Sequence, residues 1–252
     1  MARAIFVALL AYVTMLPVLF AQTPRAGVLW QNMPLIALLN GDYTADVTAE
    51  KAVTYGDTGL GAFANLDGEM VAVDGKIYRV RSDGKVTSAA ANDLLAFAQM
   101  IAFHPDRKMP IPPNTSLDTL AAVLSSEMPA PNSSYGIRIS GSFVSIDARA
   151  PHSQHEPFPP FCEVQKSQAV FHLRGVEGTM VGFAAPAYLS ILETTPFHFH
   201  FVARDLASGG HVLAFQTKNA TAELQLVNRM QVDFPQSAGF AKTPLARVIT
   251  CP

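Results

Sequence analysis

The sequence predicts an α+β protein built mainly on β-sheets, with a few short helices beside them. Three Asp-Gly pairs, at residues 67–68, 74–75 and 83–84, separate short runs rich in Val, Ile and Tyr, which indicates an antiparallel meander over residues 59–87. Residues 197–201 alternate Phe and His with the period of two that a strand imposes. The chain has 252 residues, 49% of them hydrophobic, which is enough to form one large domain or two small ones.

The first half of the chain is expected to combine this meander with short helices. Residues 28–40 are apolar and predict a short strand that leads into a short helix ending at Gly41. Residues 48–56 predict a second helix, for which Thr48 is a suitable N-cap. Residues 90–103 fit either a helix or a buried strand. Residues 104–113 contain four prolines and predict a loop, and residues 116–126 predict a helix capped by Ser116.

The second half is expected to consist mainly of strands, at residues 135–139, 169–173, 179–183 and 197–201. A turn over residues 174–178 would join the second and third of these strands. The proline-rich stretch 150–161 contains His152 and His155, and we interpret it as a surface loop rather than a second metal site. Residues 66–71 and 176–181 are faintly alike, which hints at two related halves.

Three histidines are predicted to share one face of a hairpin. In a strand, His198 and His200 point to one side and the three phenylalanines of the same run point to the other. Residues 204–210 have the polar and glycine-rich composition of a hairpin loop, and residues 211–215 predict the returning strand. If the register pairs His211 with His198 or His200, the third imidazole falls on the same face.

Three imidazoles on one face predict a metal site. Zinc suits them, with Zn–N distances of roughly 2.0–2.1 Å and a fourth position open for water or substrate, which is typical of a catalytic site. Copper, nickel and iron also accept imidazole, so the spacing does not fix the metal. The alternative is a strand that carries histidines without binding any ion.

Two charged residues are candidates for catalysis. Glu69 begins a strand after the first Asp-Gly turn and shares its face with Val71 and Val73, where burial would raise its pKa and suit it to act as a general acid. Arg138 lies among small neighbours in the strand 135–139, with room to reach a ligand. The alternatives are a solvated glutamate at a strand edge and a solvated arginine.

The first 21 residues have the parts of a secretory signal: a basic start, an apolar run from residue 4 to 20, and a small residue before the expected cut. The mature chain is then expected to begin near Gln22 and to be secreted or periplasmic. An uncleaved membrane anchor is the alternative. In an oxidising compartment Cys162 and Cys251 are able to form one disulfide, although the sequence does not show that they meet.

Composition also limits the classes of molecule that the protein is expected to bind. The net charge is −2 and no run of lysines and arginines stands out, which argues against nucleic acid. After signal cleavage no stretch is long and apolar enough for stable membrane association. Glycine-rich nucleotide-binding signatures are absent from the sequence, so we expect no organic cofactor.

Four ordered blocks of the sequence resemble the acetolactate decarboxylases. They are Tyr55-Gly-Asp-Thr-Gly-Leu-Gly-Ala-Phe-Ala-Asn-Leu-Asp-Gly-Glu69, Tyr135-Gly-Ile-Arg-Ile-Ser-Gly-Ser-Phe143, Gly175-Val-Glu-Gly-Thr-Met-Val-Gly-Phe183, and Phe197-His-Phe-His-Phe201 with Ser208-Gly-Gly-His-Val-Leu213. The resemblance implies a two-part α/β protein built on β-sheets, commonly a homodimer, that converts (S)-2-acetolactate to (R)-acetoin and CO2.

The resemblance also implies roles for particular residues. It places the zinc ligands at His198, His200 and His211, and the active-site carboxylate and arginine at Glu69 and Arg138. We accordingly divide the mature chain into an N-terminal sheet region, residues 22–150, with Glu69 and Arg138, and a C-terminal sheet region, residues 151–252, with the histidines.

The sequence departs from the family pattern at two places. Ala62 stands where the family usually has Thr, and no carboxylate side chain follows Asp233, whereas the family has a further acidic residue on a C-terminal tail that folds over the site. We therefore expect tail closure to be absent or built differently. Two alternative functions remain open at this point: a zinc hydratase or hydrolase, and a secreted zinc-binding protein without catalysis.

Overall fold

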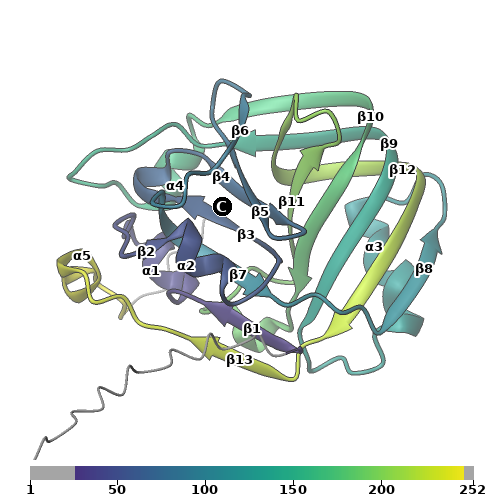
Figure 1. The fold of residues 1–252 in the computed structure, drawn as a ribbon, viewed down its shortest axis with the longest axis horizontal. Helices are drawn as coiled ribbons and strands as arrows, with labels where there is room; N and C mark the ends of the chain where they lie inside the picture. Colours follow the sequence, from purple (N-terminus) through teal and green to yellow (C-terminus); the bar gives the residue numbers. More distant parts are fainter. Residues whose placement is uncertain (1–25, 247–252) are drawn as a thin grey trace, which may run out of the picture.

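The computed structural model describes residues 26–246 and consists of two β-sheets that pack against each other, with short helices around them (Figure 1). The predicted α+β class is confirmed. Strands β3 and β4 of the first sheet contact β10, β11 and β12 of the second sheet. The two sheets therefore enclose a shared interior between their facing sides.

The first sheet has eight strands and contains the predicted meander. Its main order is β13-β1-β7-β3-β4-β5-β6, and β2 pairs with β7 outside this path. Residues 90–103, which fitted either a helix or a strand, contain strand β7, which lies inside the sheet between β1 and β3. The bounds are β1 (Val28–Gln31), β2 (Val47–Thr48), β3 (Thr58–Phe63), β4 (Glu69–Val73), β5 (Lys76–Val80), β6 (Val86–Ser88), β7 (Leu94–Ile101) and β13 (Arg229–Val232).

The second sheet has five strands in the order β11-β10-β9-β12-β8, and β11 also pairs with β12. Three of its strands are 16 to 18 residues long, so the sheet is much taller than the first (Figure 1). The bounds are β8 (Arg107–Ile111), β9 (Tyr135–Ala150), β10 (Ala169–Ala184), β11 (Phe197–Ala203) and β12 (Gly209–Leu226).

Two expectations for this sheet were wrong. Residues 104–113 contain strand β8, which lies at the edge of the sheet and, among residues 26–246, pairs only with β12, so that a proline such as Pro110 is tolerated. Residues 174–178 are not a turn between two strands, because β10 runs through them without a break and pairs with β9 on both sides of Gly175. The positive φ of +60° at Gly175 is a local irregularity that this residue accepts easily.

The helices are short and begin mostly where the sequence predicted them. Thr48 accepts a hydrogen bond from the Lys51 backbone N–H at the start of α2, and Ser116 forms a capping box with Thr119 at the start of α3. The α-helices are α1 (Leu35–Leu39), α2 (Ala49–Val53), α3 (Leu117–Leu124), α4 (Phe161–Gln165) and α5 (Ala238–Lys242), and the 3-10 turns are η1 (Ala64–Leu66), η2 (Ser125–Glu127) and η3 (Ala187–Leu189).

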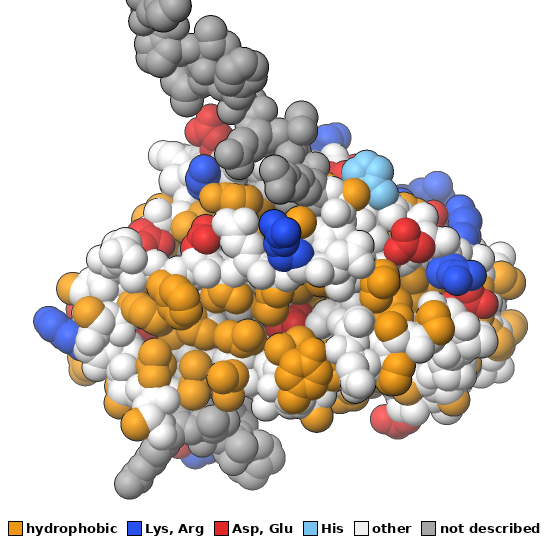
Figure 2. Space-filling view, turned by 90° about the horizontal axis from the view of Figure 1, so that it is seen from below, with side chains coloured by type: hydrophobic (Ala, Val, Ile, Leu, Met, Phe, Trp, Pro, Cys, Tyr) orange, Lys and Arg blue, Asp and Glu red, His pale blue; other side chains and the backbone are white. Residues whose placement is uncertain are grey.

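Apolar side chains fill two main layers. One buried cluster joins α3 to the second sheet and includes Phe199 and Phe201 of β11. The other packs α1 and α4 against the first sheet and reaches Phe183 of β10. A broad band of apolar side chains also lies on the surface of the face seen from below, the side on which Figure 1 shows β1 and β13 (Figure 2).

The predicted division of the chain at residue 150 does not coincide with the division between the sheets. Strand β9, which ends there, belongs to the second sheet, while β13 near the C-terminal end returns to the first. The predicted signal at residues 1–21 and Cys251 lie outside the described residues, so the signal and the disulfide with Cys162 stay predictions. Within residues 26–246, none of the helices has the length and apolar character that a membrane crossing requires.

Candidate functional site

The three histidines meet on one face of the second sheet, as the alternation of residues predicted. Strands β11 and β12 pair antiparallel with His200 opposite His211, and His198 lies two residues before His200 on the same face. The phenylalanines of β11 pack into the core on the opposite side of the sheet. Neighbouring β10 presents Gly182 to β11, where an added Cβ would lie 2.0 Å from the His198 carbonyl oxygen. A glycine at this position therefore lets the strand that carries His198 approach closely.

The ring nitrogens of the histidines converge. Nε2 of His198 and Nε2 of His200 each lie 3.2 Å from Nδ1 of His211. Two nitrogens bound to the same tetrahedral zinc, at Zn–N distances of roughly 2.0–2.1 Å, lie about 3.4 Å apart. The cluster thus has close to the spacing of a three-histidine zinc site, and it is the one such group of candidate ligands found among residues 26–246.

The histidines are also in the protonation state that metal binding needs. His200 donates from Nδ1 to the Met70 carbonyl oxygen at 2.8 Å, which leaves the lone pair on Nε2, the atom that faces the cluster. Burial lowers the pKa of His200 to about 3, and it lowers the pKa of His198 and His211 well below the ordinary value of 6.5. Three neutral imidazoles with convergent nitrogens fit a divalent ion such as zinc.

Glu69 is the carboxylate beside this cluster. It is 5% exposed, and its Oε2 lies 3.6 Å from Nε2 of His200. Burial raises the pKa of Glu69 to about 7, although the guanidinium of Arg149 acts in the opposite direction. The sequence-based expectation of a buried glutamate on this strand agrees with its position. At neutral pH such a group is able both to hold and to release a proton.

Arg149 is a site residue that the sequence analysis missed. It lies near the end of β9, directly opposite His211 of β12, and its Nη1 is 4.0 Å from Oε1 of Glu69. The side chain is 5% exposed, and the same Nη1 donates a hydrogen bond to Gln168 at 2.9 Å. Burial lowers the pKa of this guanidinium and Glu69 opposes that effect. The result is a fixed positive charge in an almost dry environment.

Arg138 lies elsewhere. Its guanidinium forms ion pairs with Asp74, at 2.8 Å, and with Glu223, at 2.9 Å, away from the histidines. It is on the same strand as Arg149 but eleven residues earlier, which corresponds to roughly 36 Å of strand at 3.3 Å per residue. The structure therefore does not bring Arg138 together with the other predicted site residues.

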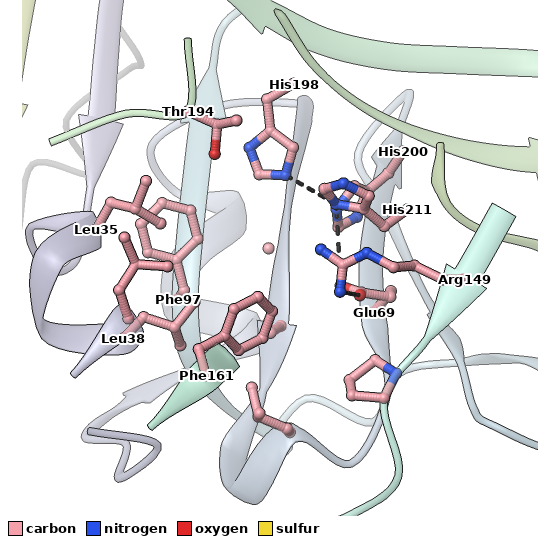
Figure 3. A pocket seen from close by; sticks show the side chains of 15 residues that line it. Leu35, Leu38, Glu69, Phe97, Arg149, Phe161, Thr194, His198, His200 and His211 are labelled. Atoms are coloured by element: carbon pink, nitrogen blue, oxygen red, sulfur yellow. Dashed lines mark hydrogen bonds and ion pairs between the residues drawn. The ribbon is translucent and has the colours of Figure 1, made fainter. Parts of the chain in front are cut away.

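A pocket joins these groups to an apolar wall (Figure 3). The polar groups lie on one side, and Thr194 approaches His198 from the loop before β11. The opposite side is formed by residues of α1, β7 and α4, chiefly Leu35, Leu38, Phe97 and Phe161. Ala62 and Leu66 also line the pocket, whereas His152 and His155 are exposed in the loop after β9, as expected of a surface loop.

A pocket of this kind is typical of an enzyme that acts on a small polar molecule. Groups able to hold a metal ion, a proton and a negative charge lie within a few ångströms of one another, and apolar walls limit the access of water. A structural metal site would instead close the ion in with a fourth protein ligand.

Comparison with known proteins places this enzyme in a family. The family model for alpha-acetolactate decarboxylase matches residues 29–247. The alpha-acetolactate decarboxylase of Brevibacillus brevis is 32% identical over 234 residues, covering 93% of this chain and 82% of the relative. That of Bacillus subtilis strain 168 is 33% identical, covering 84% and 83%.

Solved structures of similar proteins support the same family. The alpha-acetolactate decarboxylase of Bacillus subtilis strain 168 superimposes with a TM-score of 0.85 at 32% identity, covering 87% of this chain and 94% of that one. A Staphylococcus aureus protein described as similar to alpha-acetolactate decarboxylase gives a TM-score of 0.83 at 25% identity, covering 88% and 94%. The chain belongs to the alpha-acetolactate decarboxylase family and is a carboxy-lyase.

Proposed function

We propose that this enzyme converts (S)-2-acetolactate to (R)-acetoin and CO2, with zinc held by His198, His200 and His211. The observation that supports this most is the meeting of Glu69 and Arg149 with the three histidines in one buried pocket. Decarboxylation of a 2-hydroxy-3-keto acid needs a sink for the electrons that CO2 leaves behind and a proton donor, and a cation is able to bind and orient the carboxylate. The pocket offers a group for each of these needs.

Arg149 binds the substrate carboxylate in this proposal, and it takes the place of Arg138, the active-site arginine that the family resemblance implied. A guanidinium held in a dry pocket forms strong charge-assisted hydrogen bonds to a carboxylate. Its neighbours keep it in place, since Gln168 accepts from Nη1 and the Phe161 ring lies 5.3 Å from the guanidinium carbon. The carboxylate thereby acquires one orientation with respect to the histidines.

The reaction breaks the bond between the carboxylate carbon and C2, and the electron pair stays on C2 in conjugation with the C3 ketone. Zinc bound by the three histidines would act as a Lewis acid for the negative charge that develops on the ketone oxygen. The histidines contribute by staying neutral, which leaves all three nitrogens available as ligands.

Glu69 supplies the proton that replaces CO2 at C2. Its raised pKa allows the carboxyl group to be protonated at neutral pH and to be reprotonated from solvent after each turnover. Because Glu69 occupies one fixed place beside His200, it would deliver the proton to a single face of C2. That geometry would account for the formation of one enantiomer, which we propose to be (R)-acetoin.

The apolar wall completes the site. Leu35, Leu38 and Phe97 offer contacts for the methyl groups of the substrate and limit the entry of bulk water. A low dielectric strengthens the interaction of Arg149 with the carboxylate. No organic cofactor has a role in this scheme.

We further propose that the chain is exported and acts as a homodimer. The signal-like pattern at residues 1–21 supports export, and the resemblance to the family supports the dimer. The band of apolar side chains on the face near β1 and β13 is a suitable surface for a second copy, since broad exposed apolar patches mark interfaces. N-terminal sequencing of the secreted protein and analytical ultracentrifugation test the two statements.

The activity is tested with purified protein and racemic acetolactate, with the acetoin resolved on a chiral column. Acetoin should form as the (R) enantiomer, disappear after chelation and return with zinc. Glu69→Gln should bind zinc but release little acetoin. A folded, zinc-loaded wild-type protein that forms no acetoin would refute the proposal and would favour zinc binding or hydration chemistry.

A further inference from the structure

His198 has an unusual position among the three histidines. Its Nε2 faces the cluster, but its Nδ1 is buried and has no hydrogen-bond partner among residues 26–246. His200 differs, because its Nδ1 is held by the Met70 carbonyl oxygen. Of these two predicted zinc ligands, His200 is therefore anchored by a protein atom and His198 is not.

This difference affects metal binding. A neutral imidazole that offers Nε2 to a metal carries its proton on Nδ1, so His198 then presents a buried N–H donor that needs an acceptor. Histidines bound to metals almost always donate this N–H to a second group, which fixes the tautomer and the orientation of the ring. An acceptor for His198 is expected nearby.

Thr194 is the candidate. It lines the same pocket, and its side chain lies beside the His198 ring with the hydroxyl oxygen directed into the cavity (Figure 3). Of the described residues that line the pocket, it is the one with a hydroxyl group. That hydroxyl forms no hydrogen bond to another described residue, so both of its lone pairs are available as acceptors.

The segment that carries Thr194 is firmly held. The preceding residue, Glu193, is 1% exposed and accepts hydrogen bonds from Ser134 at 3.0 Å and Gln99 at 3.2 Å. One residue earlier, the carbonyl oxygen of Leu192 accepts from the backbone N–H of Leu35 at 3.2 Å, at the start of α1. Glu193 thus points into the protein interior while Thr194 points into the pocket.

We propose that Thr194 is a positioning residue, whose hydroxyl oxygen accepts the Nδ1–H of His198 when the three histidines hold a metal ion. This inference rests on the proposed metal site. This bond would hold the His198 ring in the orientation that directs Nε2 to the metal. Glu193 acts indirectly, by fixing the backbone from which Thr194 extends.

The test compares the zinc affinities of full-length variants by competition with a chromophoric chelator. Thr194→Val keeps the shape of the side chain and removes the acceptor, so zinc should bind about tenfold more weakly. Thr194→Ser restores the hydroxyl and should come within about threefold of the wild type, since the acceptor atom is retained. The exposed Thr87 of β6 supplies the matched control, and Thr87→Val should bind zinc as the wild type does.

A second measurement separates positioning from a general loss of structure. In the zinc-loaded wild type, a nitrogen-15 spectrum should show His198 protonated at Nδ1 with a slowly exchanging proton, and exchange should be much faster in Thr194→Val. If that variant unfolds, Thr194→Ala and Thr194→Ser allow the same comparison. Wild-type zinc affinity and unchanged exchange in the variants without the hydroxyl would overturn the inference.

The same experiments distinguish this inference from the proposed reaction. A zinc-loaded wild type that forms no acetoin would count against the reaction, while the comparison of zinc affinities would still decide the role of Thr194. A wild type that binds no zinc at the histidines would overturn both.

Discussion

The sharpest prediction concerns two arginines of one strand. Replacing Arg149 by Met removes the guanidinium from the pocket but keeps most of the apolar volume of the side chain. If Arg149 binds the substrate carboxylate, the loss of a charge-assisted hydrogen bond is worth about 1.5–3 kcal/mol. At ~1.4 kcal/mol per factor of ten, kcat/KM should fall by about 10-fold to 150-fold.

The fold should survive this change because Glu69 is able to adjust its charge. The guanidinium lowers the pKa of Glu69, so without it the pKa rises above about 7 and the carboxyl group becomes neutral instead of remaining a buried lone charge. Circular dichroism and zinc content should therefore match the wild type, and the loss should be confined to turnover of acetolactate.

Arg138→Met is the matched control. Its side chain is 22% exposed and pairs with Asp74, which is 77% exposed, and with Glu223. Surface ion pairs contribute about 0–1 kcal/mol, so this variant should lose little stability and keep the wild-type kcat/KM. Acetoin release from both variants, measured at several substrate concentrations, decides between the arginines. Full activity of Arg149→Met with loss in Arg138→Met would refute the assignment.

Three further predictions follow from the site. His200→Ala should lose zinc and activity together, as measured by metal analysis and acetoin release, and activity without bound metal would contradict the metal site. Glu69→Gln should retain zinc and lose most turnover. In the protein without metal, Glu69 has a pKa of about 7 in the folded state and about 4.5 in the unfolded state. Between these pH values only the folded state keeps the proton, so the free energy of unfolding falls as the pH rises. At ~1.4 kcal/mol per pKa unit, the wild type should lose about 3 kcal/mol of unfolding free energy between pH 4.5 and pH 7, measured relative to the Glu69→Gln variant. Urea titrations in which the difference between the two proteins stays constant with pH would refute this prediction.

Much of the fold could be predicted because it depends on local signals. The Asp-Gly turns define β3 to β6, and the caps at Thr48 and Ser116 define the starts of α2 and α3. The three-histidine site was also accessible, since it needs only the alternation along β11 and one hairpin register. Strand β8 was missed because its pairing with distant β12 outweighs the local preference of its proline.

Arg149 was missed for a different reason. Its place in the site depends on the pairing of β9 with β12, two long strands that are far apart in sequence. The pairs His211 with Arg149 and Glu223 with Arg138 enclose twelve steps of β12 but only eleven of β9, because two irregularities add a residue in β12 and one adds a residue in β9. Each such irregularity changes which residues face one another, so a register extrapolated from one end of the pair is wrong at the other.

Arg138 and Arg149 differ in the charged groups that surround them in the folded protein. Both lie on β9, Arg138 between two isoleucines and Arg149 between two alanines, and neither local sequence shows which carboxylates the arginine meets. Arg138 is neutralised by Asp74 and Glu223, carboxylates from two other strands or turns, whereas Arg149 meets one buried carboxyl that is itself able to become neutral. An arginine with a buried, adjustable partner keeps charge available for an incoming carboxylate, while one that is fully paired at the surface does not. The chemistry of Arg149 is therefore set by long-range pairing, and only the folded arrangement of β9, β11 and β12 reveals it.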